Sequence, residues 1–348
     1  MSLTPTDTPA STTTTPEAVV PQWCQWIAVL FMVFIVIFVL CYFAKEFSRC
    51  RCRKGCFHSS RDETKEVAGP NEEINQSPDK GPSMPEPDAN GITLQPLANR
   101  TGRSNRGAPH IRTKTRTSRS KGSISSGTSE NWSGMVAGSN LNRVTRGSVT
   151  GVVGSFRVPT ITRPSNGRAA YCSAWVGIDG YNNGTVQQIG IEADWDPVHN
   201  RPTYYAWTEF YPSPALEIVG LPINDNDLFT VSVTLTNSVT GQFRSVITNV
   251  THNVSYTVPS RYTINRNAQC ASAEWIVEAP YENGILPLAP YGTITWTACQ
   301  ANVNNVVGAI TNSAWNAVKL SMVNSSNHVI SQCNSIGVNS QTFSTTFI

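Results

Sequence analysis

The stretch Ala273-Glu-Trp-Ile-Val-Glu278 alternates apolar and acidic side chains, and this alternation decides the fold class. Side chains of a β-strand point in turn to its two faces. One face therefore takes the three apolar side chains around Trp275, which we predict to belong to the core. The other face takes Glu274, Ile276 and Glu278, and it must look onto either water or a site.

Short alternating runs of this kind continue from Trp132 to the C-terminus, separated by turn residues such as NNG, NDND and ENG. β-branched and aromatic residues dominate these runs. We expect no helix beyond one turn near Asn312–Val318. Many short strands at this spacing predict one all-β domain over residues 126–348, either a sandwich or a barrel.

Three further predicted strands, 173–179, 187–192 and 205–211, also have one apolar face and one polar, aromatic face. Ordinary solvent-facing strands prefer Thr, Lys, Ser and Arg. A face that combines Trp, Tyr, Gln, Asp and Glu without Lys is instead typical of a concave binding groove. The sequence therefore predicts a groove on one side of the domain.

Familiar catalytic motifs are missing from the sequence. It contains no Gly-x-Ser-x-Gly elbow, no His-Glu-x-x-His, no P-loop and no aspartic-protease pair. The five histidines lie outside the alternating strands, so we expect no metal site and no cofactor. Any chemistry in the groove must come from carboxylates, with an amide as helper.

Taken together, five blocks of this sequence resemble the glutamic peptidases, or eqolisins, a family of acid endopeptidases of filamentous fungi. The resemblance covers about residues 130–348, with the blocks in family order: NWSG (131–134), AWVGIDG (174–180), QQIGIE (187–192), YAWTEFYP (205–212) and AEWIVE (273–278). It implies a concanavalin-like, lectin-like β-sandwich of two antiparallel sheets. It also implies protein or peptide substrates that lie in the groove of one sheet.

The same resemblance assigns the catalytic pair to Gln188 and Glu278. Glu278 is implied as the general base that takes a proton from water, and the Gln188 amide as the donor to the developing oxyanion. Glu192 is our choice for the groove carboxylate that follows Gln188. Substrate-binding roles are implied for Trp132, Trp175, Asp179, Glu192, Trp207, Glu209 and Tyr211.

Two other functions remain open on the sequence alone. Glu209 and Glu278 are also suited to act as the two carboxylates of a glycoside hydrolase. The Trp and Tyr side chains would equally suit a lectin-like binding domain without enzymatic activity.

The part before the domain has three segments. Residues 1–25 are rich in Thr and Pro, and residues 26–44 form an apolar run without a charge that predicts one retained membrane span. Residues 45–125 are polar, and we expect a disordered tether. Its end, Arg100–Lys121, contains eight Lys and Arg and no acid, so we consider it a possible inhibitory propeptide.

The basic run lacks the motifs of a nucleic-acid-binding domain, so we expect no nucleic-acid partner, and we expect a monomer. Basic residues follow the predicted span, which by the positive-inside rule places the domain in the cytosol. The family resemblance implies the lumenal or extracellular side instead. The sequence does not choose between them, nor between two disulfides and none for the four cysteines Cys172, Cys270, Cys299 and Cys333.

Overall fold

The computed structural model describes residues 84–97, 109, 111–116 and 122–348, and of residues 112–116 the backbone alone. The described part consists of β-strands and one 3-10 turn, η2 (Ser260–Tyr262). The prediction of an all-β fold is therefore confirmed. The helical turn expected near Asn312–Val318 is wrong, because a strand, β16 (Asn316–Val323), starts there.

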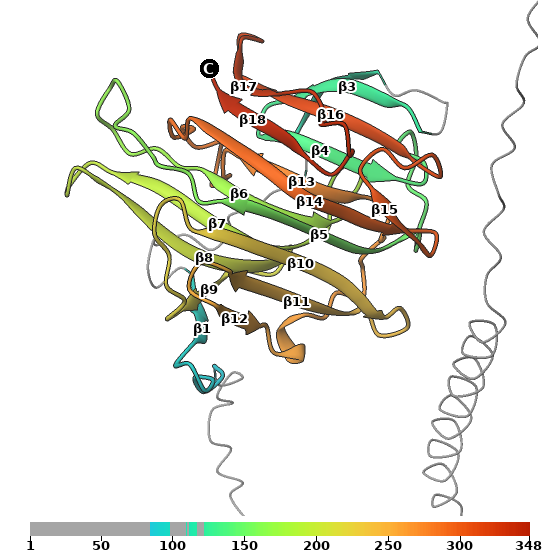
Figure 1. The fold of residues 1–348 in the computed structure, drawn as a ribbon, viewed down its shortest axis with the longest axis horizontal. Helices are drawn as coiled ribbons and strands as arrows, with labels where there is room; N and C mark the ends of the chain where they lie inside the picture. The colour runs from blue at the N-terminus through green and yellow to red at the C-terminus, as the bar shows by residue number, and fades with distance from the viewer. Residues whose placement is uncertain (1–83, 98–108, 110, 117–121) are drawn as a thin grey trace, which may run out of the picture. The chain divides into compact units, whose positions relative to one another are not determined.

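The strands pair into two layers that are joined where β16 meets β17 (Figure 1). The first layer runs in the order β1 (Thr93–Pro96), β9 (Leu216–Val219), β8 (Arg201–Tyr211), β7 (Val186–Asp196), β6 (Ser173–Ile178), β13 (Ala273–Glu278), β4 (Trp132–Gly138), β16, β3 (Ile124–Ser129) and β2 (Arg112–Arg116). The second layer runs β17 (Val329–Cys333), β18 (Phe343–Phe347), β14 (Thr293–Val303), β5 (Val149–Arg157), β10 (Leu228–Asn237), β11 (Gln242–Asn249) and β12 (Val254–Thr257), with β15 (Val306–Ala309) also paired to β14. All of these pairings are antiparallel except the one between β16 and β3.

The main core lies between the layers, where β5 packs on β13 and β10 packs on β6 and β7. From β13 it receives Ala273, Trp275 and Val277, as the alternation predicts. The Trp275 indole also donates a hydrogen bond of 2.8 Å to the carbonyl of Val153 on β5. The apolar face of each predicted strand therefore fixes which side of the first layer turns inward.

The prediction of a disordered tether over 45–125 needs a correction for its described parts. Strand β1 lies within that range and pairs with β9. Leu94 of β1 and Ile92, just before the strand, are both buried in the main core. β2 lies there too, paired with β3. A four-residue strand is too short to show a clear alternation of apolar and polar residues in the sequence. Its pairing with β9 could therefore not be predicted from the pattern.

The predicted membrane span at 26–44 lies outside the described residues. Within the described ranges, no helix combines the length and the apolar character needed to cross a membrane. The cysteines Cys172, Cys270, Cys299 and Cys333 are free and buried, so none of the pairings left open by the sequence occurs among them.

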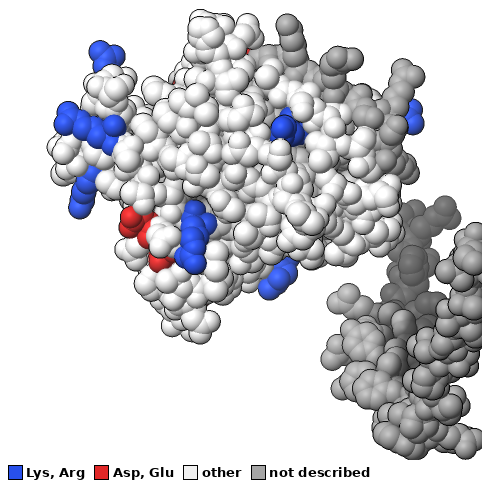
Figure 2. All heavy atoms as spheres, turned by 45° about the horizontal axis from the view of Figure 1, so that its top comes forward, with Lys and Arg blue, Asp and Glu red and all other residues white. Residues whose placement is uncertain are grey.

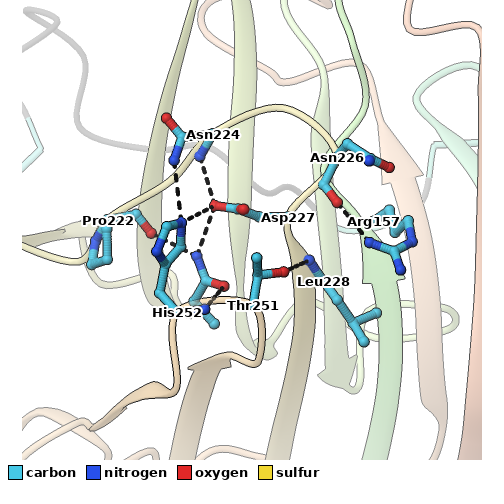
Figure 3. A network of polar contacts seen from close by, with 9 residues as sticks. Arg157, Pro222, Asn224, Asn226, Asp227, Leu228, Thr251 and His252 are labelled. Carbon is cyan, nitrogen blue, oxygen red and sulfur yellow. Dashed lines mark hydrogen bonds and ion pairs between the residues drawn. The ribbon is translucent and has the colours of Figure 1, made fainter.

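Charged side chains are few and scattered on the face of the molecule drawn in Figure 2. On the second layer, Asp227 ties the loop before β10 to the turn after β11 (Figure 3). Its carboxylate accepts hydrogen bonds of 2.9 Å from the Asn224 backbone and from the Asn249 side chain, and His252 lies 3.2 Å away. Burial raises the pKa of Asp227, but these hydrogen bonds and His252 outweigh it, so the pKa is lowered.

Candidate active site

The strand register arranges the outer face of the first layer, which we call the acidic face, into three rows that run across the strands. The Gln188 row contains Glu274, Gly177, Gln188 and Glu209. The Trp175 row contains Ile276, Trp175, Gly190, Trp207 and Glu217. The Glu278 row contains Trp132, Glu278, Ser173, Glu192 and Tyr205.

The carboxylate of Glu278 is held by two donors from different parts of the chain. The Trp175 indole donates to Oε2 at 2.9 Å, and the Asn131 amide donates to Oε1 at 3.2 Å. Trp132 follows Asn131 and packs edge-on against Trp175, with ring centroids 5.0 Å apart. Glu278 is completely buried, so both oxygens have a fixed direction and little freedom to rotate.

Gln188 lies on β7 and is completely buried as well. Its Nε2 donates a hydrogen bond of 2.8 Å to Oε2 of Glu209 on the neighbouring strand β8. Its Oε1 has no hydrogen-bond partner among the described residues. The amide is thus oriented by a carboxylate on one side, while its acceptor atom is available on the other.

Gln188 and Glu278 lie diagonally opposite each other on the acidic face, one row on each side of the Trp175 row. On β7, Gly190 lies between these two rows. Because it has no side chain, there is space beside it for the side chain of Trp175. A Cβ built on Gly190 would lie 2.3 Å from the Ala174 carbonyl oxygen and 2.5 Å from the Trp175 Cβ. Glycine at this position therefore allows Trp175 to lie between the two rows and reach Glu278.

Glu274 shares the face and the strand of Glu278, but its surroundings differ. It is completely buried, and neither carboxylate oxygen has a hydrogen-bond partner within the described part of the chain. Burial raises the pKa of Glu274 well above its usual range; the Ser272 hydroxyl opposes this effect, and the charge of Asp179 adds to it. The structure therefore gives Glu274 and Glu278 different surroundings, although both lie on the same face of the strand.

Asp179 directly follows β6 and has a positive φ of 77°. Its carboxylate points toward main-chain amides. The backbone N–H groups of Gln269, Cys270 and Ala271 each donate to it at 2.8 Å, and Asn183 donates at 2.9 Å. Burial raises the pKa of Asp179, and these hydrogen bonds oppose that effect. Asp179 thus shapes the loop before β13, a contact that the sequence assignment to substrate binding did not include.

The other residues that the resemblance named fall on or beside the acidic face. Glu192 accepts a hydrogen bond from the Ser173 hydroxyl, and Trp132, Trp175 and Trp207 form one buried apolar cluster with Tyr211 packed at its margin. These tryptophans are fully buried although they point away from the second layer. A cleft lined by Phe156, Thr160 and Thr295 lies on the second layer.

Sequence reasoning missed two contributors to the site. Asn131 was noted only as part of the NWSG block, and its contact with Glu278 depends on β4 lying beside β13. The bond from Ser173 to Glu192 follows from the pairing of β6 with β7. Both are short polar residues whose roles depend on non-local pairing, for which a single sequence has no signal.

The folded part of the chain is similar to known proteins. Residues 130–346 match the model of the Peptidase A4 family. Aspergillopepsin-2 of Aspergillus niger is 28% identical over 193 residues, which cover 50% of this chain and 64% of that protein. Scytalidopepsin B of Scytalidium lignicola is 38% identical over 78 residues, which cover 22% of this chain and 28% of that protein. The chain therefore spans less than two thirds of the length of either relative.

The fold is similar to a solved one, the crystal structure of scytalido-glutamic peptidase with a transition state analog inhibitor. That likeness has a TM-score of 0.50 and 22% identity, and it covers 63% of this chain and 98% of the other. It bears on the fold alone. Since the family model matches more than half of the chain, the chain belongs to the Peptidase A4 family, the eqolisins.

Proposed function

We propose that this chain is a glutamic endopeptidase that hydrolyses peptide bonds with Glu278 and Gln188. The observation that supports this assignment best is the contrast between the two side chains. The Glu278 carboxylate is oriented by Trp175 and Asn131, whereas the Gln188 amide still has an acceptor atom without a partner among the described residues.

In the first step, ionised Glu278 acts as the general base. The bonds from Trp175 and Asn131 hold its carboxylate in a fixed direction. The carboxylate accepts a proton from a water molecule, and the water oxygen attacks the carbonyl carbon of the substrate. The rigid hold on Glu278 supports this step, because a fixed base needs no reorientation.

The Gln188 amide stabilises the oxyanion that forms. Its NH₂ group has two hydrogens, and one of them is used by Glu209. The second is available to the oxyanion, and Oε1 is available to the attacking water. Gln suits this role because it donates a hydrogen bond without titrating.

In the last step, protonated Glu278 transfers its proton to the nitrogen of the leaving amine while the C–N bond breaks. The products are a carboxylic acid and an amine, and Glu278 is regenerated.

We also propose that the apolar run at 26–44 anchors the enzyme in a membrane as a single span. We further propose that its substrates are proteins or peptides and that the chain is a monomer.

The proposal is tested by comparing two matched variants of the full chain, Glu278→Gln and Glu274→Gln, on denatured protein and on polysaccharide across acidic pH. We expect Glu278→Gln to lose about 10²–10⁴-fold in peptide hydrolysis, since the general base is removed. Glu274→Gln should keep its activity, and circular dichroism should show both variants folded. Normal turnover by Glu278→Gln, or cleavage of polysaccharide alone, would refute the assignment.

A further inference from the structure

Three loops at one end of the domain carry arginines without any acidic residue. They follow β4, join β10 to β11 and precede β13, and they comprise residues 139–148, 238–241 and 264–270. Their charged side chains, all exposed, are Arg143, Arg146 and Arg266. The acid beneath the loops, Asp179, is buried and accepts hydrogen bonds from backbone N–H groups. The loops therefore carry a positive charge that none of their own residues balances.

The three loops line one cavity of about 270 Å³. Arg146 and Arg266 both line it, together with Ser238 and Asn265. Neither arginine has a hydrogen bond or an ion pair with the described part of the chain. Burial raises the pKa of the Cys270 thiol, which also lines the cavity, and the charge of Arg146 opposes this effect, so the Arg146 guanidinium acts on the cavity wall. Two guanidinium groups beside a hydroxyl and an amide are donors that suit a phosphate group.

Backbone hydrogen bonds hold both arginines in place. Gly147, which follows Arg146, donates its N–H to the loop before β13 at 2.8 Å. Asn265, which precedes Arg266, donates its N–H to the carbonyl of Gly241 at 2.9 Å. A Cβ on Gly241 would lie 2.3 Å from the Asn265 carbonyl oxygen, so only glycine allows the β10–β11 turn to approach this closely. The cavity is therefore formed before any ligand arrives.

Around the cavity, each loop exposes an aliphatic side chain. Val239, in the turn between β10 and β11, is 91% exposed, and Ile264 and Val144 are 45% and 38% exposed. A cationic cavity surrounded by aliphatic side chains matches the layers of a membrane surface, where anionic headgroups lie above acyl chains. A binding site for a free anion would have no need of these side chains.

We propose that this end of the domain binds an anionic phospholipid surface, with a headgroup phosphate between Arg146 and Arg266 and with Val239 in the interface. The apolar run at 26–44, our proposed span, would keep the domain near such a surface, where even weak contacts suffice. The site does not include Glu278 or Gln188. It can therefore be present or absent whether or not the chain is a peptidase.

The test uses the full chain in vesicles, with the photo-crosslinking amino acid p-benzoylphenylalanine at Val239. We expect crosslinks to lipid in phosphatidylcholine vesicles that contain phosphatidylserine, and at least about tenfold fewer in phosphatidylcholine alone. The matched control has the probe at Val198, which is 83% exposed in the turn between β7 and β8, at the opposite end of the domain (Figure 1). The control should give no lipid crosslink in either kind of vesicle.

A pair of double variants tests the cavity itself. Arg146→Gln with Arg266→Gln should lower the lipid crosslink from position 239 at least about tenfold, since one arginine near an anionic surface contributes roughly fivefold to binding. Arg168→Gln with Arg201→Gln removes two exposed arginines at the opposite end and should leave the yield unchanged.

Equal lipid crosslinking in both kinds of vesicle would overturn the proposal, as would an unchanged yield after the loss of Arg146 and Arg266. Crosslinks from position 239 to protein alone would point to a protein partner and would also overturn it. Titration of the detergent-solubilised chain with inorganic phosphate, followed by phosphorus NMR, distinguishes the other source of the anion. Phosphate binding without any lipid crosslink would assign the cavity to free phosphate and refute the membrane contact.

Discussion

Glu274 provides the most direct test of the chemistry derived from the structure. It is a completely buried carboxyl group with no hydrogen-bond partner among the described residues, and burial raises its pKa. The folded state therefore favours its protonated form. Replacing it by Gln keeps the shape of the side chain and removes the titration.

The sign of the effect follows from linkage. A carboxyl whose pKa is raised on folding contributes its full stability below the unfolded pKa, and this contribution is lost as pH rises toward the folded pKa. Within that window the free energy of unfolding falls by about 1.4 kcal/mol per pH unit for one proton. Glu274→Gln should thus change stability little in acid, since both side chains are then neutral, and should stabilise the chain progressively toward neutral pH.

The assay is urea unfolding of the full chain, followed by tryptophan fluorescence from acidic to neutral pH, with Glu86→Gln as a control at an exposed position. Asp227 contributes the opposite dependence, because its lowered pKa gives stability that is lost in acid. The difference between variant and wild type isolates Glu274 from it. Parallel curves for wild type and Glu274→Gln would refute the reasoning, since Glu274 would then be ionised or solvated.

Three further predictions concern the other polar side chains. Gln188→Ala should lower kcat by about 10²–10³-fold, as expected for an oxyanion donor, and Gln188→Glu should not restore it in acid; near-normal kcat in Gln188→Ala would exclude that role. Trp175→Phe removes one donor to Glu278 and should lower kcat about 10- to 100-fold with KM nearly unchanged, whereas a change in KM alone would point to substrate contact instead. Asp179→Ala leaves two buried N–H groups and one partly buried N–H group without their acceptor. It should lower the free energy of unfolding by at least about 3 kcal/mol in urea titrations, and a loss below about 1 kcal/mol would contradict this.

The local alternation of apolar and polar residues predicted which side of each strand belongs to the core. Trp275 and Ile189 lie in the main core as their parity requires, and Trp175 and Gln188 lie on the opposite face. This works because strand periodicity is a property of the backbone and does not depend on which strands pair.

The sequence did not predict the pairing partners, and several site properties depend on them. The contact of Asn131 with Glu278, for example, depends on the pairing of β4 with β13, which are far apart in the chain. The burial of the acidic face was missed for a related reason. A face of Trp, Glu and Gln has the same pattern whether water, substrate or the chain itself lies on it.

The stretch 273–278 contains two acids on one face of one strand, and their environments differ. Glu278 receives hydrogen bonds from Trp175 and Asn131, whereas burial raises the pKa of Glu274 and so favours its neutral form. Because the two lie four residues apart on a strand, no difference in parity separates them. Their neighbours on β4 and β6 distinguish the two acids. Glu278 lies opposite Trp132 and Ser173, whereas Glu274 lies opposite Val136 and Gly177. The environment of each acid on this strand is therefore decided by the adjacent strands rather than by the strand itself.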